Sequence, residues 1–236
     1  MQTELNLFQG IQRLCSHHNI LSISGKSGTG KTTLALHLIG KLLTKNDPFT
    51  DSCIWIQASE KFPVRRLTQI FEDSSQESDY IRNNIYIIPQ KGLIHTYEEQ
   101  TSLLKKIINP KFNKPPFLKY IVIDNISHHL RYKISHYNTP KDISSLLDSF
   151  YDTLLMPLII FCKRNEIVLI LIHEVTYSPK LEKVRPFFYK LYDRIRTIDI
   201  VLSKVNNDEK KNLLMNFNGT KWKFQFILKQ EGIILI

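Results

Sequence analysis

The sequence has few of the features that would tie this protein to an oxidising compartment or to a membrane. It contains 3 cysteines in 236 residues, and Cys15, Cys53 and Cys162 form no C-x-x-C pair. An odd number of widely spaced cysteines predicts neither a disulfide framework nor a zinc site. The first residues lack a basic segment followed by an apolar core, so we expect no signal peptide. Apolar runs are short, and the one at 154–162 contains Pro157. We therefore expect no membrane partner and an intracellular protein, cytoplasmic or nucleoid-associated, or nuclear in a eukaryote.

Glycine and proline are also scarce, and acidic residues are outnumbered by basic ones. The chain has 8 Gly and 10 Pro, whereas 42% of its residues are hydrophobic and 11% are aromatic. This composition is typical of a globular protein. The length and the absence of a repeat or linker predict a single domain over 1–236. Residues 1–18 are expected to form a short lead, and we expect no separate N-terminal DNA-binding domain. The net charge of +10 favours an anionic partner such as nucleic acid, although a lysine-rich surface also serves solubility.

The segment 25–32 has the order G-x-x-x-x-G-K-[ST] that is typical of a phosphate-binding loop. An apolar run at 19–24 precedes it, and Leu34, Leu38 and Leu42 follow at helical spacing. This pattern predicts a strand before the loop and a helix after it. Both are required for the motif to work, because the backbone N–H groups and the helix N-terminus together attract a phosphate.

The loop predicts an ATP site with Mg²⁺. Lys31 is expected to reach the terminal phosphates, and the Thr32 hydroxyl is expected to hold the metal ion. The residues predicted to bind the nucleotide are Gly25, Lys26, Ser27, Gly28, Thr29, Gly30, Lys31, Thr32 and Thr33.

A second candidate metal ligand is Asp124, which follows the apolar run 120–123. A central parallel strand reads as a continuous hydrophobic run, and ligands bind beyond the carboxyl end of such a strand. An Asp in this place is typical of a turn cap, but after a phosphate-binding loop we interpret it as the carboxylate that holds Mg²⁺.

The remaining pattern alternates strands and helices and ends in strands. Strands are predicted at 53–57, 85–88 and 167–172, and helices at 63–71, 97–108 and over about 20 residues ending near 164 with a bend at Pro157. The polar stretch 72–80 predicts a loop. From 195 onward we predict strands at 195–203, 213–217 and 222–227, with a hairpin loop at 206–211.

This order resembles a RecA-like ATPase core. Ile123-Asp124-Asn125 is similar to the Walker B ending of recombinases, and 171–175 lies where RecA/RadA recombinases have a strand ending in Asn-Gln-Val. The segments 53–67 and 222–234 also resemble that family. The chain looks most like its short single-domain paralogues, such as archaeal RadB. The resemblance implies a mostly parallel α/β sheet with helices on both faces and antiparallel C-terminal strands.

The chain departs from the family at the expected catalytic positions. The family's catalytic Glu aligns with Ser59, and Glu60 lies one residue later as a candidate that a register shift could bring in. Glu174 replaces the Gln that senses the γ-phosphate, and His173 replaces the preceding Asn. Glu174 is either a substitute base with a raised pKa or a polar strand end facing solvent. With Lys31, Glu60 and Glu174 as candidate catalytic residues, we expect ATP binding with slow turnover.

Two basic segments are candidate contacts for single-stranded DNA, because cations with interleaved aromatic rings suit such a ligand. The first is 131–137 and the second is 180–190; the alternative is a solvated basic face with Phe187, Phe188 and Tyr192 in the core. The spacing of the histidines matches no common zinc pattern. The residues predicted to bind DNA are Arg131, Lys133, Lys183 and Arg185.

The sequence therefore favours an ATP-binding recombinase paralogue in homologous recombination and DNA repair. It would bind single-stranded DNA, recombinase subunits or both, in a homo- or hetero-oligomer, with weak DNA-dependent ATP hydrolysis. One alternative is an interaction protein that uses nucleotide only for structure. A third hypothesis is a regulatory ATPase of the KaiC type or a helicase-like motor, which the chain length disfavours.

Overall fold

The computed structural model describes residues 2–45, 50–72, 75–178, 183–205 and 209–236. Its strands are β1 (Ile20–Gly25), β2 (Ser52–Gln57), β3 (Ile85–Ile88), β4 (Leu118–Asp124), β5 (Val168–His173), β6 (Val175–Ser178), β7 (Lys183–Pro186), β8 (Ile198–Lys204), β9 (Lys211–Phe217), β10 (Thr220–Lys229) and β11 (Gly232–Leu235). Its helices are α1 (Gln2–Cys15), α2 (Lys31–Leu43), α3 (Val64–Ile70), α4 (Ser75–Asn84), α5 (Tyr97–Ile108), α6 (His128–Ile134), α7 (Pro140–Phe150), the π-helical η1 (Tyr151–Leu155), α8 (Met156–Arg164) and α9 (Tyr189–Tyr192).

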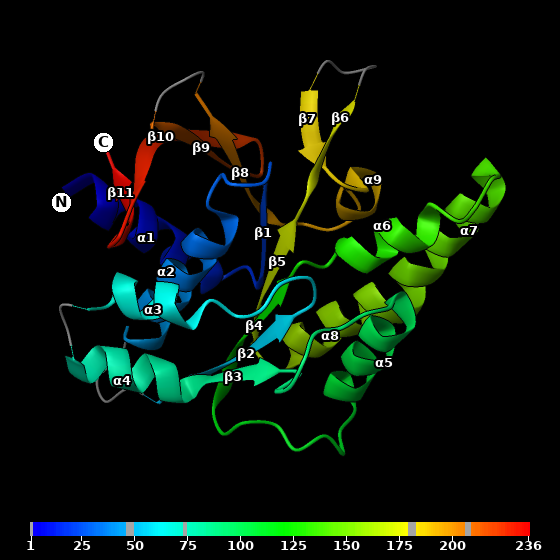
Figure 1. Cartoon of the computed structure of the whole chain (residues 1–236), viewed down its shortest axis with the longest axis horizontal. Coiled ribbons are helices and arrows are strands. Elements are labelled where there is room, and N and C mark those ends of the chain that lie inside the picture. Colours follow the sequence, from blue (N-terminus) through cyan, green and yellow to red (C-terminus); the bar gives the residue numbers. More distant parts are fainter. Residues whose placement is uncertain (1, 46–49, 73–74, 179–182, 206–208) are drawn as a thin grey trace.

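Nine of these strands form one sheet in the order β11-β10-β9-β8-β1-β5-β4-β2-β3 (Figure 1). The strands from β3 to β8 in this order run parallel, and β9, β10 and β11 continue the sheet antiparallel. The predicted mostly parallel sheet with antiparallel C-terminal strands is therefore confirmed. Strands β6 and β7 pair with each other in a separate ribbon.

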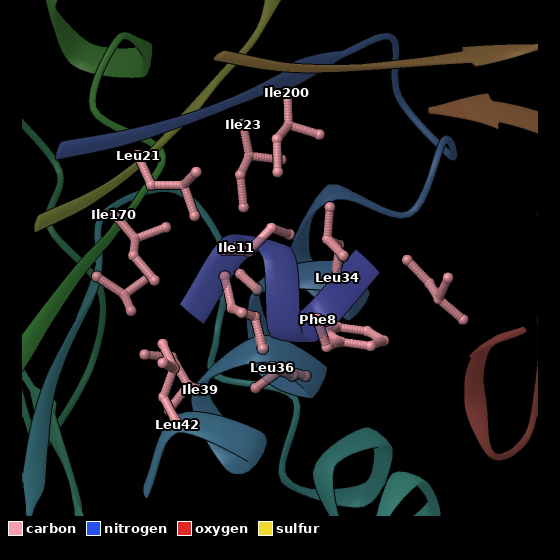
Figure 2. Packing of buried hydrophobic residues seen from close by; sticks show 14 of the residues in the cluster. Phe8, Ile11, Leu21, Ile23, Leu34, Leu36, Ile39, Leu42, Ile170 and Ile200 are labelled. Atoms are coloured by element: carbon pink, nitrogen blue, oxygen red, sulfur yellow. The ribbon is translucent and has the colours of Figure 1, made fainter. Parts of the chain in front are cut away.

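The central strands β2, β4 and β5 contain continuous apolar runs because both faces of the sheet are covered there. Helices α1 to α4 lie on one side of the sheet and α5 to α8 on the other (Figure 1). Figure 2 shows the packing on the first side, where α1 and α2 meet the central strands. The labelled side chains are Phe8, Ile11, Leu21, Ile23, Leu34, Leu36, Ile39, Leu42, Ile170 and Ile200, all of them buried.

Within the predicted lead at 1–18, residues 2–15 form α1, which packs against β1. Leu7, Phe8 and Ile11 of α1 are buried in the core cluster that also contains Leu21 and Ile23. These three apolar side chains recur at helical spacing, so one face of α1 packs on the sheet. From Leu7 onward, this segment is therefore part of the core on the first side of the sheet.

Two stretches predicted without helices contain them. The prediction of a loop at 72–80 is wrong, because α4 begins at Ser75; residues 73 and 74 lie outside the described residues. Ile81 of α4 is fully buried in the core, and this contact outweighs the poor helix propensity of the polar residues around it. The basic segment after Asp124 forms α6, with Leu130 buried against the opposite face of the sheet.

The predicted long helix before β5 is present with an interruption. It comprises α7, a π-helical turn at Tyr151–Leu155 and α8, whose first turn contains Pro157. By length and composition residues 140–164 could cross a membrane. Phe150, Leu154 and Leu158 are buried in the core cluster on the sheet, whereas 33% of the apolar window as a whole is buried.

Candidate functional site

The candidate site is a cavity of about 570 Å³ beyond the carboxyl ends of parallel strands. β1 leads into the phosphate-binding loop. Asp124 is the last residue of β4, and Glu174 and Ser59 follow the ends of β5 and β2. These four strands are neighbours in the sheet, so their ends meet at one edge. The cavity is lined by Gly25, Lys26, Ser27, Gly28, Gly30, Lys31, Thr32, Thr33, Ser59, Glu60, Asp124, Asn125, His128, Arg131, Glu174 and Val175.

The predicted strand, loop and helix are present around residues 25–32. Gly30 precedes the first residue of α2 and has φ of 96°, a left-handed conformation that favours glycine. At Gly25 a Cβ atom would lie 2.5 Å from Thr29 Oγ1 and 2.7 Å from the Leu202 carbonyl oxygen. The motif's glycines are therefore required by the backbone path of the loop.

Two side chains of the loop, Lys31 and Thr32, make polar contacts beside the cavity. The Lys31 ammonium donates hydrogen bonds to the carbonyl oxygens of Gly25 at 2.9 Å and Lys26 at 3.2 Å. The Thr32 hydroxyl donates to Asp124 Oδ2 at 2.8 Å, although the two residues are 92 positions apart in the chain. Two oxygen ligands of the kind that Mg²⁺ prefers are thus in direct contact, and the residues present fit a nucleotide with its metal ion.

Burial governs the protonation of the two central charges. It raises the pKa of Asp124 to about 6, aided by Glu60 and opposed by the Thr32 hydrogen bond and by Lys31. Burial lowers the pKa of Lys31, against the attraction of Asp124, Glu174 and Glu60. The protein therefore does not fully stabilise the ionised form of either side chain. A bound metal ion would stabilise the Asp124 carboxylate, and a bound phosphate would stabilise the Lys31 ammonium.

The end of β2 is tied to the end of β4 beside these residues. The backbone N–H groups of Ala58 and Ser59 donate to the Asp124 carbonyl oxygen at 2.7 and 3.3 Å. Ser59 and the exposed Glu60 both line the cavity, and the charge of Glu60 acts on Asp124 and on Lys31. Glu60 is thus close enough to be the candidate that the sequence offers in place of the family Glu.

Glu174 lies inside the same cavity and is held by two basic side chains. Arg131 Nη1 is 2.6 Å from Glu174 Oε2, and His128 Nδ1 is 3.6 Å from Glu174 Oε1. The Arg131 guanidinium also lies over the Phe187 ring, 4.9 Å from its centre. The interpretation of Glu174 as a side chain that only faces solvent is therefore not supported, because it is 30% exposed and paired.

The residues predicted to bind DNA are not gathered into one free surface. Arg131 is in the nucleotide cavity, and Lys133 Nζ pairs with Glu98 Oε1 at 2.6 Å. Arg185 Nη1 is 3.8 Å from Asp193 Oδ2 and lies over the Tyr189 ring. The Lys183 side chain and residue 180 lie outside the described residues. DNA binding by these side chains stays a prediction.

Other sequence hypotheses have mixed outcomes. Tyr192 is buried as expected of a core residue, whereas Phe187 and Phe188 are half-buried. His173 is fully buried beside Tyr192, and burial lowers the pKa of His173 to about 3. No group of three metal-ligating side chains occurs within the described ranges.

Among the cavity residues, the sequence did not predict His128, Asn125 or Val175, and it assigned Arg131 to DNA binding instead. The two of these residues on α6 are His128 and Arg131. They are three positions apart on α6, so they lie on one face of that helix. A helix assigned directly after Asp124 would have pointed this face at the same strand ends. The sequence predicts no helix there, because a segment rich in His, Arg and Tyr gives no clear helical pattern.

A larger cleft of about 1010 Å³ runs along the edge strand β3. Lys61 and Lys114 are the only charged residues that line it. Its described lining residues include neither a carboxylate for a metal ion nor a glycine-rich loop before a helix, so it lacks the features that make the smaller cavity the candidate nucleotide site.

The structure has a RecA-like, recombinase-type fold, and a phosphate-binding loop follows β1. The family model for the NB-ARC domain matches residues 5–105, which include the loop. The structure resembles one described as "Crystal structure of the RadB recombinase", with a TM-score of 0.67, 16% identity, and coverage of 91% of this chain and 89% of that chain. None of the curated proteins matches the chain by sequence. In all, 341 solved chains match the structure, so the fold alone does not single out one activity.

Proposed function

We propose that residues 1–236 act as a single RecA-like domain that binds ATP with Mg²⁺, and that the protein is an intracellular recombinase paralogue serving DNA recombination and repair. The observation that carries the nucleotide proposal is the Thr32–Asp124 contact at 2.8 Å beside the half-buried Lys31. Charged and hydroxyl groups are brought together there from distant parts of the chain, and burial disfavours the ionised form of both Asp124 and Lys31. Perturbed groups of this kind in a cavity are typical of a ligand site.

Each side chain has a separate task in this proposal. Lys31 leaves its two loop carbonyls and donates to the terminal phosphates, while the loop N–H groups orient them. Thr32 and Asp124 would hold a metal ion, and that ion would supply charge neutralisation for the phosphates. Glu60, or Glu174 once it is released from Arg131, accepts the proton of the attacking water. Neither carboxylate occupies the position of the family Glu, so we expect slow hydrolysis.

The nucleotide proposal is tested by replacing Lys31→Ala and measuring ATP affinity by calorimetry. We expect a loss of affinity of about ten-fold or more, because a charge-assisted hydrogen bond contributes about 1.5–3 kcal/mol. Lys41→Ala is the matched control, since Lys41 lies on the same helix in its last turn. Equal affinity for ATP in the Lys31→Ala variant and in the wild type would contradict the assignment.

A second candidate function is an interaction protein whose nucleotide is structural. The Arg131–Glu174 pair favours it, because this pair occupies the cavity wall where a catalytic water would be oriented. The two functions are separated by ATP turnover with and without single-stranded DNA. Hydrolysis that DNA stimulates supports the recombinase paralogue, and bound ATP that is never hydrolysed under either condition supports the structural role.

The proposal of a DNA or recombinase partner rests on the fold likeness and on the basic charge. The net charge of +10 favours an anionic ligand. We propose single-stranded DNA, a recombinase subunit or both, with Arg185 and Lys183 as candidate contacts on β7. Arg185→Gln with Lys183→Gln should weaken DNA binding and flatten its salt dependence; unchanged affinity and salt dependence would remove this segment from the interface.

A further inference from the structure

A second basic cavity lies at the opposite end of the sheet from the phosphate-binding loop. It has a volume of about 340 Å³ and is lined by His17, His18, Asn19, Ile20, Lys163 and Arg196. Three segments form it: the connection from α1 to β1, the last turn of α8 and the residues before β8. Ile20 pairs with Leu169, and Leu21 pairs with Ile198, so the cavity adjoins the amino ends of β1, β5 and β8.

The charge of this cavity is of one sign. Four of its six lining residues are basic or can become so, and none is acidic. Over the ranges that the structure describes, none of these four side chains forms an ion pair. By contrast, Arg131, Lys133 and the nearby Arg194 are each paired with a carboxylate.

The lowered pKa of His18 is consistent with the same excess of positive charge. Burial lowers the pKa of His18, and Arg196, His17 and Lys163 lower it further. Every charged group that acts on His18 is thus a cation, from each of the three segments that form the cavity. An anion bound among them would reverse this effect and raise the pKa of His18.

Contacts with the Phe217 ring and with Asn218 hold the His18 and Arg196 side chains of the cavity in place. Phe217 at the end of β9 is buried, with the His18 ring centred 4.3 Å from its ring and the Arg196 guanidinium 5.4 Å from it. Arg196 Nε donates to Asn218 Oδ1 at 2.9 Å, which fixes the guanidinium and leaves its two Nη groups available. Holding a donor fork in place before binding reduces the entropy lost when a ligand arrives.

We propose that the cavity formed by His17, His18, Lys163 and Arg196 is a phosphate-binding site, separate from the nucleotide cavity. A planar guanidinium, an ammonium and two imidazoles suit a phosphate, which accepts several charge-assisted hydrogen bonds. The phosphate is either a free phosphate or nucleotide group, or one in the backbone of a nucleic acid. This site does not depend on the proposed ATP chemistry.

The first experiment follows the His18 imidazole by NMR during titration with inorganic phosphate, with chloride at equal ionic strength as reference. The His18 signal is identified by its loss in His18→Gln. We expect phosphate, but not chloride, to shift this signal and to raise the His18 pKa. A His18 signal that responds equally to chloride and to phosphate would overturn the proposal.

Matched variants test the two long cations. Lys163→Gln and Arg196→Gln should each weaken phosphate binding about ten-fold. Arg194→Gln is the control, because it removes the same charge two positions away, where Arg194 pairs with Asp148. Lys163 is exposed at the end of α8, so Lys163→Gln keeps the test valid even if Arg196→Gln loosens the contact with Phe217. Equal phosphate affinity in all three variants would overturn the proposal.

A final measurement distinguishes the source of the phosphate. If the ligand is nucleic acid, Lys163→Gln should weaken binding of a single-stranded oligonucleotide and reduce its salt slope by about 0.7 for the lost contact. If the ligand is a free phosphate group, Lys163→Gln should weaken phosphate binding alone. Both outcomes support the site. If Lys163→Gln binds both the oligonucleotide and inorganic phosphate as tightly as the wild type, the proposed site is refuted.

Discussion

Replacing Asp124→Asn is expected to stabilise the metal-free protein while removing its response to Mg²⁺. The pKa of Asp124 is raised from 3.8 to about 6, mainly by burial. At about 1.36 kcal/mol per pKa unit, this penalises the ionised folded state by about 3 kcal/mol near neutral pH. Part of the carboxylate faces the cavity, so we expect a gain of about 1–3 kcal/mol in the free energy of unfolding when the charge is removed. Asn keeps an oxygen that accepts the Thr32 hydrogen bond.

The sign of the pH dependence follows from proton binding. Between about pH 4 and pH 6 the folded protein keeps the Asp124 proton that the unfolded chain releases. The contribution of this residue to stability therefore falls as pH rises through that window. The wild type and Asp124→Asn should differ little near pH 4, and the full difference should be present above about pH 6.

The assay is thermal unfolding in EDTA at pH 4.5 and pH 7.5. For a chain of this length 1 kcal/mol shifts Tm by about 2–4 °C, so Asp124→Asn should melt several degrees higher at pH 7.5. Asp148→Asn is the control, because Asp148 is 50% exposed on α7. Adding Mg²⁺ and ATP at about 100 times Kd should stabilise the wild type by about 2.7 kcal/mol and the variant much less. A lower or unchanged Tm of Asp124→Asn at pH 7.5 would refute the reasoning.

Three further predictions concern the cavity and the core. Arg131→Gln leaves Glu174 without its closest cation, so ATP affinity should fall more than ADP affinity by calorimetry, and adding Glu174→Gln should restore it; equal losses for both nucleotides would contradict this. Gly30→Ala should lower Tm by forcing a side chain into a left-handed conformation, where its Cβ would lie 2.9 Å from Leu228 Cδ2; an unchanged Tm would count against it. Ile81→Ala should cost about 2–5 kcal/mol in urea unfolding, with the exposed Arg82→Ala as control; a difference below about 0.5 kcal/mol would mean that α4 is not anchored by this side chain.

Local patterns predicted much of the fold because its parallel strands are buried on both faces. Such strands appear as uninterrupted apolar runs, and the runs at 120–123 and 167–172 both lie in the central sheet. Helix α4 could not be predicted in this way, since one buried residue, Ile81, anchors a polar segment whose local propensity is low. The same holds for α6, which is fixed mainly by burial of Leu130.

For the site, the sequence determined the phosphate-binding loop and the candidate metal ligands, because the order of glycines, Lys31 and Thr32 encodes a local backbone geometry. Only the tertiary structure decided which distant groups face that loop. In the folded chain Asp124 contacts Thr32. Arg131, which the sequence assigned to a DNA-binding surface, is paired with Glu174 instead. The physical reason is that strand order and register set these contacts, and they depend on the burial of both sheet faces rather than on any nearby residue.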